Sequence, residues 1–154
     1  MSKTIIVTGT FSGIGEAILN HFYTLGFNCV CLDLKTFDPC ERDLDPSRVL
    51  SLKCDVSSEA QVIESFEKVL KSFNSIDVLV NNSGLQHISP LTEFPVEKWD
   101  QLTGVMLKGP FLCSKEAFKF MQKKKEGRII HISSIHGKVA SPFRPPISRP
   151  NMVF

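Results

Sequence analysis

The sequence predicts an α/β fold, built on a doubly wound parallel sheet with helices on both faces. Short apolar runs, too brief for helices, alternate along the chain with longer segments of helical period, which is the pattern of successive strand and helix units. The 154 residues, of which 42% are hydrophobic and 22% charged, have the composition of one folded globular domain. Five strands with their intervening helices fill this length. We therefore expect a doubly wound sheet that is incomplete, with its C-terminal strands and helices missing.

The first two strands flank the first helix. An apolar run at 4–8 predicts a buried strand, and a helical period at 13–25 predicts a helix that Gly26 ends. The predicted buried face of this helix consists of Ile14, Ile18, Phe22 and Leu25. A second apolar run at 28–34 predicts the next strand, which should be buried on both faces like the first.

The third strand leads into the second helix. We expect the strand at 49–56, after a polar, proline-containing loop at 39–47, and it too should be buried on both faces. Ser58 and Gln61 have the spacing of a capping box that opens a helix. The inner face of that helix is marked by Val62, Phe66, Val69 and Phe73.

The last two strands enclose the longest helical segment. Apolar runs predict strands at 76–80 and 128–132, and the residues between them have helical period over 96–125. Gly104 and Gly109, the latter followed by a proline, interrupt this period, so we expect a kink there.

Charge and cysteine content exclude several classes of protein. The net charge is only +2, with Lys and Arg spread along the chain, so no nucleic-acid partner is indicated. No apolar run is long enough to cross a bilayer, which predicts a cytoplasmic protein without a membrane partner. The five cysteines are odd in number and lack CxxC spacing. They favour buried free thiols over a zinc site or a disulfide framework.

A glycine-rich turn follows the first strand in the segment TGTFSGIG. Glycines suit such a turn because the backbone bends sharply there and lets a diphosphate approach the free amides at the helix N-terminus. On this motif alone, a plain tight turn is an equal alternative. The candidate cofactor-binding residues of the turn are Gly9, Ser12, Gly13, Ile14 and Gly15.

Polar residues end the next three strands. Asp33 ends the second strand, where a carboxylate can accept from both hydroxyls of a ribose and repels a 2′-phosphate, which favours NAD over NADP. Asp55 and Val56 end the third strand and would border an adenine pocket. Asn82 and Gly84 end the fourth strand, at the edge where open parallel sheets bind ligands. A solvated aspartate at a strand end is the alternative for either acid.

These segments together resemble the short-chain dehydrogenase/reductase family. The glycine turn, Asp33, the Asp55-Val56 pair, NNSG and RIIHISSIHG match the family's motifs in order, over nearly the whole chain. The resemblance implies a Rossmann-type fold, NAD as cofactor, hydride transfer and a homo-tetramer, although this chain lacks part of the tetramer's surfaces. It also implies that Ser134 is the catalytic serine.

Within the family, NNSGLQHISPLTEFPVEKWD and SSIHGKVASPFR are most similar to the D-3-hydroxybutyrate dehydrogenases. This narrower resemblance implies a small hydroxy or keto acid as substrate, with its carboxylate held by Gln86, His136 and Arg144. An amide, an imidazole and a guanidinium can all donate hydrogen bonds to such an anion. A loop glutamine, a surface histidine and a solvated arginine are the alternatives.

The family's proton-transfer residues are missing from the matching positions. The resemblance implies a tyrosine thirteen residues after Ser134 and a lysine four residues later, but these positions hold Ile147 and Asn151. Isoleucine has no titratable proton and asparagine no positive charge. Met106 stands where the family has an asparagine in the long helix. We therefore expect this chain to be inactive.

The composition changes near the same positions. All nine glycines precede residue 138, whereas four of the nine prolines fall in the last thirteen residues. The segment PPISRPNMVF at 145–154 can be encoded so that another reading frame yields AYISAKHGF, which contains Tyr-x-x-x-Lys. We hypothesise a truncated NAD-binding domain at 1–144 followed by a frameshifted tail at 145–154. An isoform with an unrelated tail is the alternative.

Three functions remain open at this point. The chain is an inactive product of a 3-hydroxybutyrate dehydrogenase gene, a non-catalytic NAD-binding module that regulates a partner, or an enzyme with residual activity. A flavodoxin-like FMN protein is disfavoured by NNSG and by Asp33.

Overall fold

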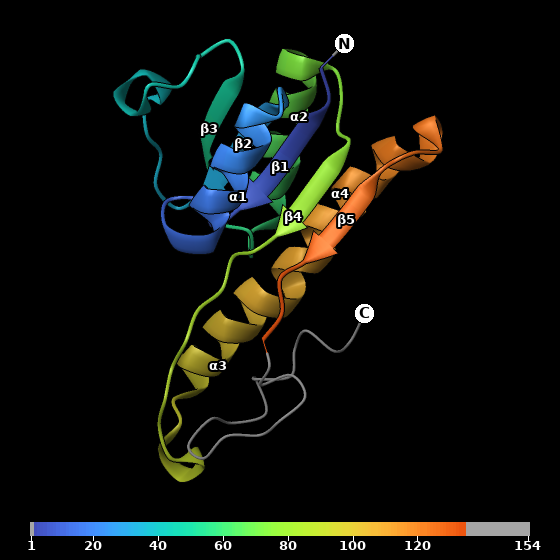
Figure 1. The fold of residues 1–154 in the computed structure, drawn as a ribbon. Coiled ribbons are helices and arrows are strands. Elements are labelled where there is room, and N and C mark those ends of the chain that lie inside the picture. Colours follow the sequence, from blue (N-terminus) through green and yellow to red (C-terminus); the bar gives the residue numbers. More distant parts are fainter. Residues whose placement is uncertain (1, 135–154) are drawn as a thin grey trace.

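The computed structural model describes residues 2–134, which form an α/β domain around one parallel sheet. Within this range the sheet has five strands in the order β3-β2-β1-β4-β5, and Figure 1 shows helices on both of its faces. The strands are β1 (Thr4–Thr8), β2 (Asn28–Asp33), β3 (Val49–Lys53), β4 (Val78–Asn81) and β5 (Arg128–His131). The main helices are α1 (Gly13–Thr24), α2 (Glu59–Phe73), α3 (Val96–Thr103) and α4 (Gly109–Lys124). The predicted fold class is confirmed, and each predicted strand is present: β1 has the predicted bounds, β3 is three residues shorter, and the others are each one residue shorter.

The strand order turns back at β1. The chain adds β2 and β3 on one side of β1 and then adds β4 and β5 on the other. In an open parallel sheet such a reversal creates a crevice outside the carboxyl ends of the two central strands. The ends of β1 and β4 are therefore where a ligand site is expected in this fold.

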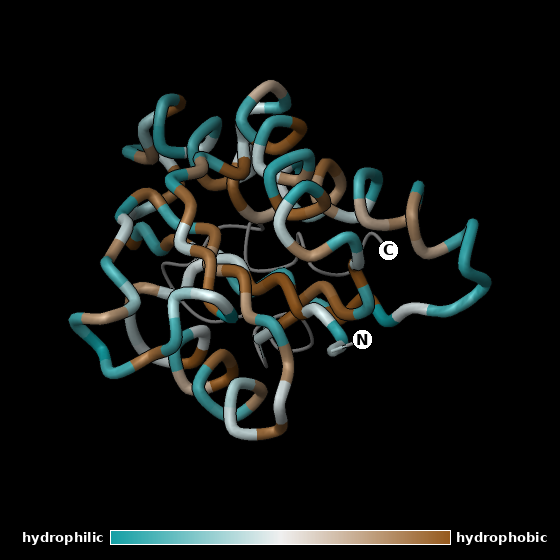
Figure 2. The backbone as a smooth tube through the Cα atoms, turned by 90° about the horizontal axis from the view of Figure 1, so that it is seen from above, coloured by the Kyte–Doolittle hydropathy of each residue, from teal (hydrophilic) through white to brown (hydrophobic). Residues whose placement is uncertain are grey.

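Two hydrophobic cores lie on opposite faces of the sheet. On one face, Ile6 of β1 and Leu79 of β4 pack with buried residues of α2 and α4. On the other face, Ile5 and Val7 pack with Leu19 of α1. The apolar central strands therefore lie between more polar helix surfaces, as Figure 2 shows by the hydropathy of the backbone.

Burial on both faces holds for β1 and β2 but was wrongly predicted for β3. All five residues of β1 are buried, because the strand is paired on both sides. In β3 only Val49 is fully buried. Among the described strands β3 pairs with β2 alone, so solvent reaches it from the open edge.

The inner face of α1 differs in part from the prediction. Ile18 and Phe22 do pack against the core, together with the buried Leu19. Ile14 is 62% exposed and Leu25 58% exposed, so their predicted burial is wrong. Gly15 faces the turn that precedes α1, and Ile14, one residue earlier, points about 100° away from it. Leu25 lies after the last residue of the helix.

The second helix begins where it was predicted but without the predicted capping box. Ser58 is the N-cap residue of α2 and makes no side-chain capping bond. Oε1 of Gln61 instead accepts a hydrogen bond of 2.8 Å from the backbone N–H of Asp55. Because β3 ends at Lys53, the turn that follows it lies within reach of Gln61. The inner face holds as predicted, with Val62, Phe66 and Val69 buried and Phe73 partly buried.

The predicted interruption of the long helix is a π-helical turn, Gly104–Lys108, between α3 and α4. Gly104, its first residue, and Gly109, which follows it, both have right-handed helical backbone angles, so the chain continues from one helix to the next. Figure 1 shows α3 and α4 following one another past the carboxyl end of the sheet. π-helical turns of this kind are frequent at functional sites.

Candidate active site

The glycine turn between β1 and α1 is closed by its own backbone and by β4. Gly9 and Gly13 have φ angles of +68° and +65°, which L side chains rarely adopt. A Cβ on Gly15 would lie 2.1 Å from the carbonyl oxygen of Gly9, so only glycine fits there. Ser12 precedes α1 without capping it by its side chain, and the first amides of the helix thus face outward from the turn. Such amides suit an anionic group.

Asn82 fastens the turn to the end of β4. Its Nδ2 donates hydrogen bonds of 3.0 Å to the carbonyl of Thr8 and 2.9 Å to the carbonyl of Gly9. The hydroxyl of Thr8 accepts in return from the backbone N–H groups of Asn82 and Ser83. The sequence led us to expect Asn82 to line the ligand crevice, whereas the structure shows it holding two turn carbonyls in place.

Asp33 lies at the end of β2, where its carboxylate meets the turn. Its Oδ2 accepts from the backbone N–H of Phe11 at 3.0 Å, and its Oδ1 from that of Lys35 at 3.3 Å. Two cationic groups stand nearby, because Lys35 and Arg42 both lie over the Phe11 ring. Arg42 is also paired with Glu16, 2.7 Å away.

Asp55 lies at the end of β3 and is held by the next turn. Its Oδ1 accepts from the backbone N–H of Ser57 at 2.9 Å and from the Ser57 hydroxyl at 2.7 Å. These bonds, together with the bond from its own N–H to Gln61, fix the orientation of the carboxyl group. Within residues 2–134 the second carboxylate oxygen accepts no hydrogen bond, which leaves an acceptor available for a ligand.

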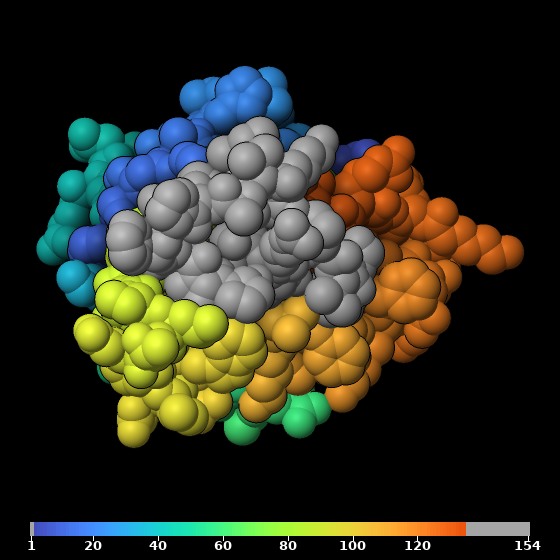
Figure 3. Space-filling model, turned by 90° about the horizontal axis from the view of Figure 1, so that it is seen from below, coloured from blue at the N-terminus to red at the C-terminus, as the bar shows by residue number. Residues whose placement is uncertain are grey.

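A cavity of about 230 Å³ joins these features at the carboxyl edge of the sheet. Five of the predicted cofactor residues line it: Gly9, Asp33, Asp55, Val56 and Gly84. Sequence reasoning did not find the other lining residues, which are Leu34, Cys54, Ser57, Ser83, Leu85, Gln101 and Val105. Most are sequence neighbours of predicted residues, but Gln101 and Val105 come from the α3 region and depend on how that helix packs. Figure 3 views this end of the molecule, where the blue N-terminal part and the yellow-green stretch before α3 both reach the surface.

Only two of the four predicted catalytic and substrate-binding residues lie within the part of the chain that the structure describes. Ser134 is exposed and follows β5, whose end pairs with the end of β4 through Asn81 and His131. Gln86 is exposed and follows Leu85, which lines the cavity. Ser134 and Gln86 therefore lie on segments that leave the same edge of the sheet. The other predicted site residues, His136 and Arg144, and the positions of Ile147 and Asn151 lie outside the described residues.

A polar contact below this edge was not foreseen from the sequence. The buried Asn81 of β4 lies 3.2 Å from the Ser114 hydroxyl of α4 and 3.4 Å from Nδ1 of His131 in β5. It links both strands to the helix beneath the site. The doubled asparagine of NNSG was the available signal, since its first member ends a strand that is otherwise apolar.

Four of the five cysteines are buried and one, Cys40, is exposed. Burial raises the pKa of the Cys29 thiol to about 11 and that of Cys31 to about 12. Burial also raises the pKa of Cys54, which lines the cavity, so this thiol is neutral at physiological pH. Within residues 2–134, no group of three His, Cys, Asp or Glu side chains could hold a metal ion. Nor is any helix in that range long and apolar enough to span a membrane.

A doubly wound parallel sheet, a glycine turn before the first helix, an acid at the end of β2 and a cavity at the carboxyl edge define a Rossmann-type domain. The sequence model for short chain dehydrogenases matches residues 3–147. The chain belongs to the short chain dehydrogenase family, whose members are oxidoreductases that use a nicotinamide cofactor and small-molecule substrates.

Known relatives agree with this assignment. The chain is 37% identical to an uncharacterised oxidoreductase of Bacillus subtilis, over 89% of this chain and 55% of that protein. It is 36% identical to a D-beta-hydroxybutyrate dehydrogenase of Rhizobium meliloti, over 94% of this chain and 58% of that protein. The solved structure of ElxO with NADP bound has a TM-score of 0.88 and 30% identity, covering 99% of this chain and 63% of that one. The chain thus spans little more than half the length of these curated relatives.

Proposed function

We propose that the chain binds NAD in the cavity at the carboxyl edge of the sheet. The observation that carries this proposal is that Asp33 and Gly9, the first glycine of the turn, line one cavity, while the Asp33 carboxylate accepts a hydrogen bond from Phe11 of the same turn. The turn also fits such a ligand, because glycine at residue 15 lets the turn pack closely against the start of α1, where a Cβ would lie 2.1 Å from the Gly9 carbonyl oxygen. The Ser12 side chain leaves the first amides of α1 uncapped, and such amides suit a diphosphate. When bound, NAD supplies the nicotinamide carbon that accepts or returns a hydride.

Each part of the site has a role in this proposal. The turn residues Gly9, Ser12, Gly13, Ile14 and Gly15 hold the diphosphate. Asp33 accepts from the adenosine ribose, and Asp55 and Val56 border the adenine. Asn82 acts through the turn that it fastens, and Gly84 lines the same cavity beyond it.

The proposed preference for NAD over NADP rests on charge. The Asp33 carboxylate would lie against the 2′-phosphate of NADP and repel it. Of the two cations over the Phe11 ring, Arg42 is held by the carboxylate of Glu16 and stacks 4.0 Å from the Phe37 ring, so its charge is already partly compensated.

Replacing Asp33 tests this preference. Asp33→Asn should weaken NADH binding about tenfold and leave NADPH binding unchanged or stronger, because it removes both a ribose acceptor and a repulsive charge. Titrations of both cofactors measure the ratio of dissociation constants. The matched control is Asp43→Asn, an equal charge change at an exposed left-handed position outside the cavity, where asparagine is well tolerated. Tighter binding of NADPH than NADH by the unaltered chain would contradict the proposal.

For the reaction, we propose the family's hydride transfer between NAD and a small hydroxy acid such as D-3-hydroxybutyrate, which becomes acetoacetate. Two D-beta-hydroxybutyrate dehydrogenases among the relatives support this substrate, at 36% and 33% identity. Gln86, His136 and Arg144 would hold the substrate carboxylate, and the Ser134 hydroxyl would donate to the reacting oxygen.

This chain should nevertheless not catalyse the reaction. Oxidation of the alcohol removes a hydride from carbon and a proton from the hydroxyl group, and that proton needs an acceptor. Ile147 and Asn151, where the resemblance implies tyrosine and lysine, cannot accept it. The purified chain with D-3-hydroxybutyrate and NAD should produce no NADH above background, while NADH binding persists. Sustained NADH production would overturn this expectation.

A non-catalytic NAD-binding module is the second candidate. It is favoured because the chain has the cavity proposed to bind NAD but holds Ile147 and Asn151 where the resemblance implies the proton-transferring tyrosine and lysine. In this case a partner protein should bind the chain with an affinity that changes on adding NAD. Equal affinity with and without NAD would leave an inactive dehydrogenase as the better description.

A further inference from the structure

We propose that Gly109, the first residue of α4, positions the adenine side of the cofactor cavity through Val56. This inference rests on the proposed binding of NAD in that cavity. Gly109 does not line the cavity, whereas Val56 does. Both residues are buried.

The contact between them leaves no room for a side chain. A Cβ on Gly109 would lie 2.9 Å from Cγ2 of Val56 and 3.2 Å from its Cβ. Carbon atoms at optimal separation lie about 3.5–4.0 Å apart, so a methyl group at residue 109 would force one of the two segments to move. Val56 is short and β-branched and cannot fold its contact atom aside as a long side chain could.

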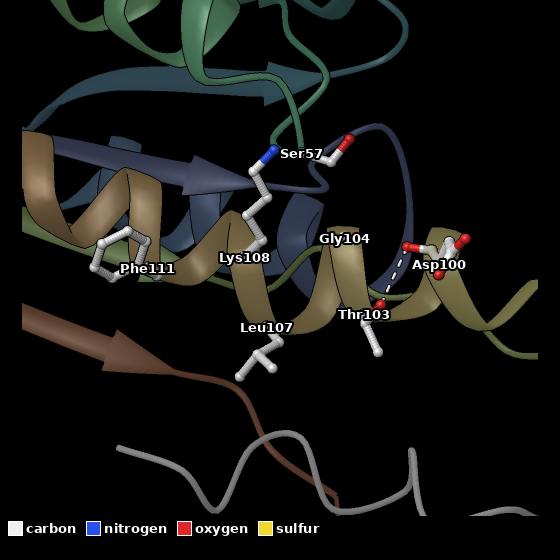
Figure 4. Close-up of a pocket in the computed structure, with 7 residues that line it drawn as sticks. All are labelled: Ser57, Asp100, Thr103, Gly104, Leu107, Lys108 and Phe111. Carbon is white, nitrogen blue, oxygen red and sulfur yellow. Dashed lines mark hydrogen bonds between the residues drawn. The ribbon is translucent and has the colours of Figure 1, made fainter.

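Ser57, the residue after Val56, has a looser contact with the helical segment that contains Gly109. A Cβ on Gly104 would lie 3.4 Å from Cβ of Ser57, an ordinary van der Waals distance. Gly104 lies on the π-helical turn (Figure 4). It lines a hollow of about 660 Å³, together with Ser57 and Lys108 among others. A methyl group at residue 104 therefore has space near it.

The two glycines make a matched pair for experiment. Gly104 has φ −56° and ψ −50°, and Gly109 has φ −58° and ψ −54°, so alanine fits the backbone of both. Alanine should favour the helical backbone equally at either position. The two substitutions differ mainly in what the added methyl group meets, which is Val56 in one case and a contact of ordinary length in the other.

Displacement of Val56 would change the cavity itself. Val56 borders it next to Asp55, whose carboxylate is fixed by hydrogen bonds to Ser57. A shift of Val56 away from Gly109 therefore changes the shape of the proposed adenine side and disturbs the neighbouring carboxylate. The part of the cavity formed by Gly9 and Gly84 lies on other segments and is not pushed.

The test measures binding of AMP and NADH by calorimetry in the full 154-residue chain. Gly109→Ala should weaken both about tenfold, the effect expected of an overpacked contact. Gly104→Ala should stay within about twofold of the unaltered chain. Val56→Ala removes the opposing methyl groups, so the double variant Gly109→Ala/Val56→Ala should bind AMP as well as Val56→Ala alone does.

Methyl resonances of Val56, recorded without ligand, give a second readout. They should shift in Gly109→Ala and not in Gly104→Ala. If the unaltered chain binds neither AMP nor NADH, the proposed function fails, and the Val56 shifts still decide whether Gly109 controls this loop. If NADH binds and Gly109→Ala, folded by circular dichroism, binds AMP as tightly as Gly104→Ala, the role of Gly109 is overturned.

Discussion

At the scale of single residues, the site depends on backbone groups more than on charged side chains. The carbonyls of Thr8 and Gly9 both accept from the side-chain amide of Asn82, and the carboxylate of Asp33 accepts from two backbone N–H groups. Motif spacing in the sequence predicted Asn82 and Asp33 as site residues. It could not identify their partners, because the direction of a side-chain hydrogen bond depends on segments far away in the chain.

Asn82 should therefore contribute to stability as well as to binding. Asn82→Ala leaves two carbonyls without their donor, and we expect the free energy of unfolding to fall by about 2 kcal/mol. NADH binding should weaken as well, since the turn loses its support. Urea unfolding measures the first effect and calorimetry the second. Asn20→Ala, at an exposed position of α1, is the control and should change stability by less than about 0.5 kcal/mol. Equal stability of the two variants would contradict this role.

At the scale of elements, apolar periodicity predicted every main helix and strand, but it predicted helix ends and orientation less well. The capping spacing of Ser58 and Gln61 is local, yet Gln61 bonds to Asp55 because β3 ends early and brings that N–H within reach. Similarly, the rotation of α1 is set by the contact of Gly15 with Gly9, which depends on tertiary packing. A local sequence pattern cannot show that Gln61 lies within reach of Asp55 or that Gly15 lies against Gly9.

Neighbouring residues of β5 should respond differently to the same change. Ile129 packs against the core formed with α4, whereas Ile130 on the other face is 42% exposed. Ile129→Thr should lower the free energy of unfolding by about 1–2 kcal/mol, because it buries a hydroxyl and removes packed carbon. Ile130→Thr should change it by less than about 0.5 kcal/mol. Urea unfolding compares them, and losses of equal size would show that both faces of β5 are packed alike.

At the scale of the whole molecule, Asp77 joins three elements at the amino end of the sheet. Its carboxylate accepts from the backbone N–H of Thr4 in β1 at 2.8 Å, from the Ser75 hydroxyl, and from Lys124 of α4 at 3.4 Å. Burial raises the pKa of Asp77, but the bonds from Ser75 and Thr4 and the charge of Lys124 outweigh burial and hold it below its ordinary value.

This link should make the fold sensitive to acid. Because the folded pKa is lower than the unfolded one, the stabilisation is complete above the ordinary carboxyl range and is lost as the pH falls through the folded pKa. The free energy of unfolding should therefore decrease below about pH 4, and less steeply in Asp77→Asn. Asp43→Asn, in an exposed loop, should keep the slope of the unaltered chain. Identical slopes in all three proteins would exclude Asp77 as the cause.

The bonds between Thr8 and Asn82 also have a consequence for how the site is made. They join residues 74 positions apart, and the glycine turn is not complete until β4 has docked beside β1. Closing so long a loop is slow compared with local helix formation. The turn therefore forms late in folding, and a peptide limited to β1, the turn and α1 would contain every residue of TGTFSGIG without its native shape.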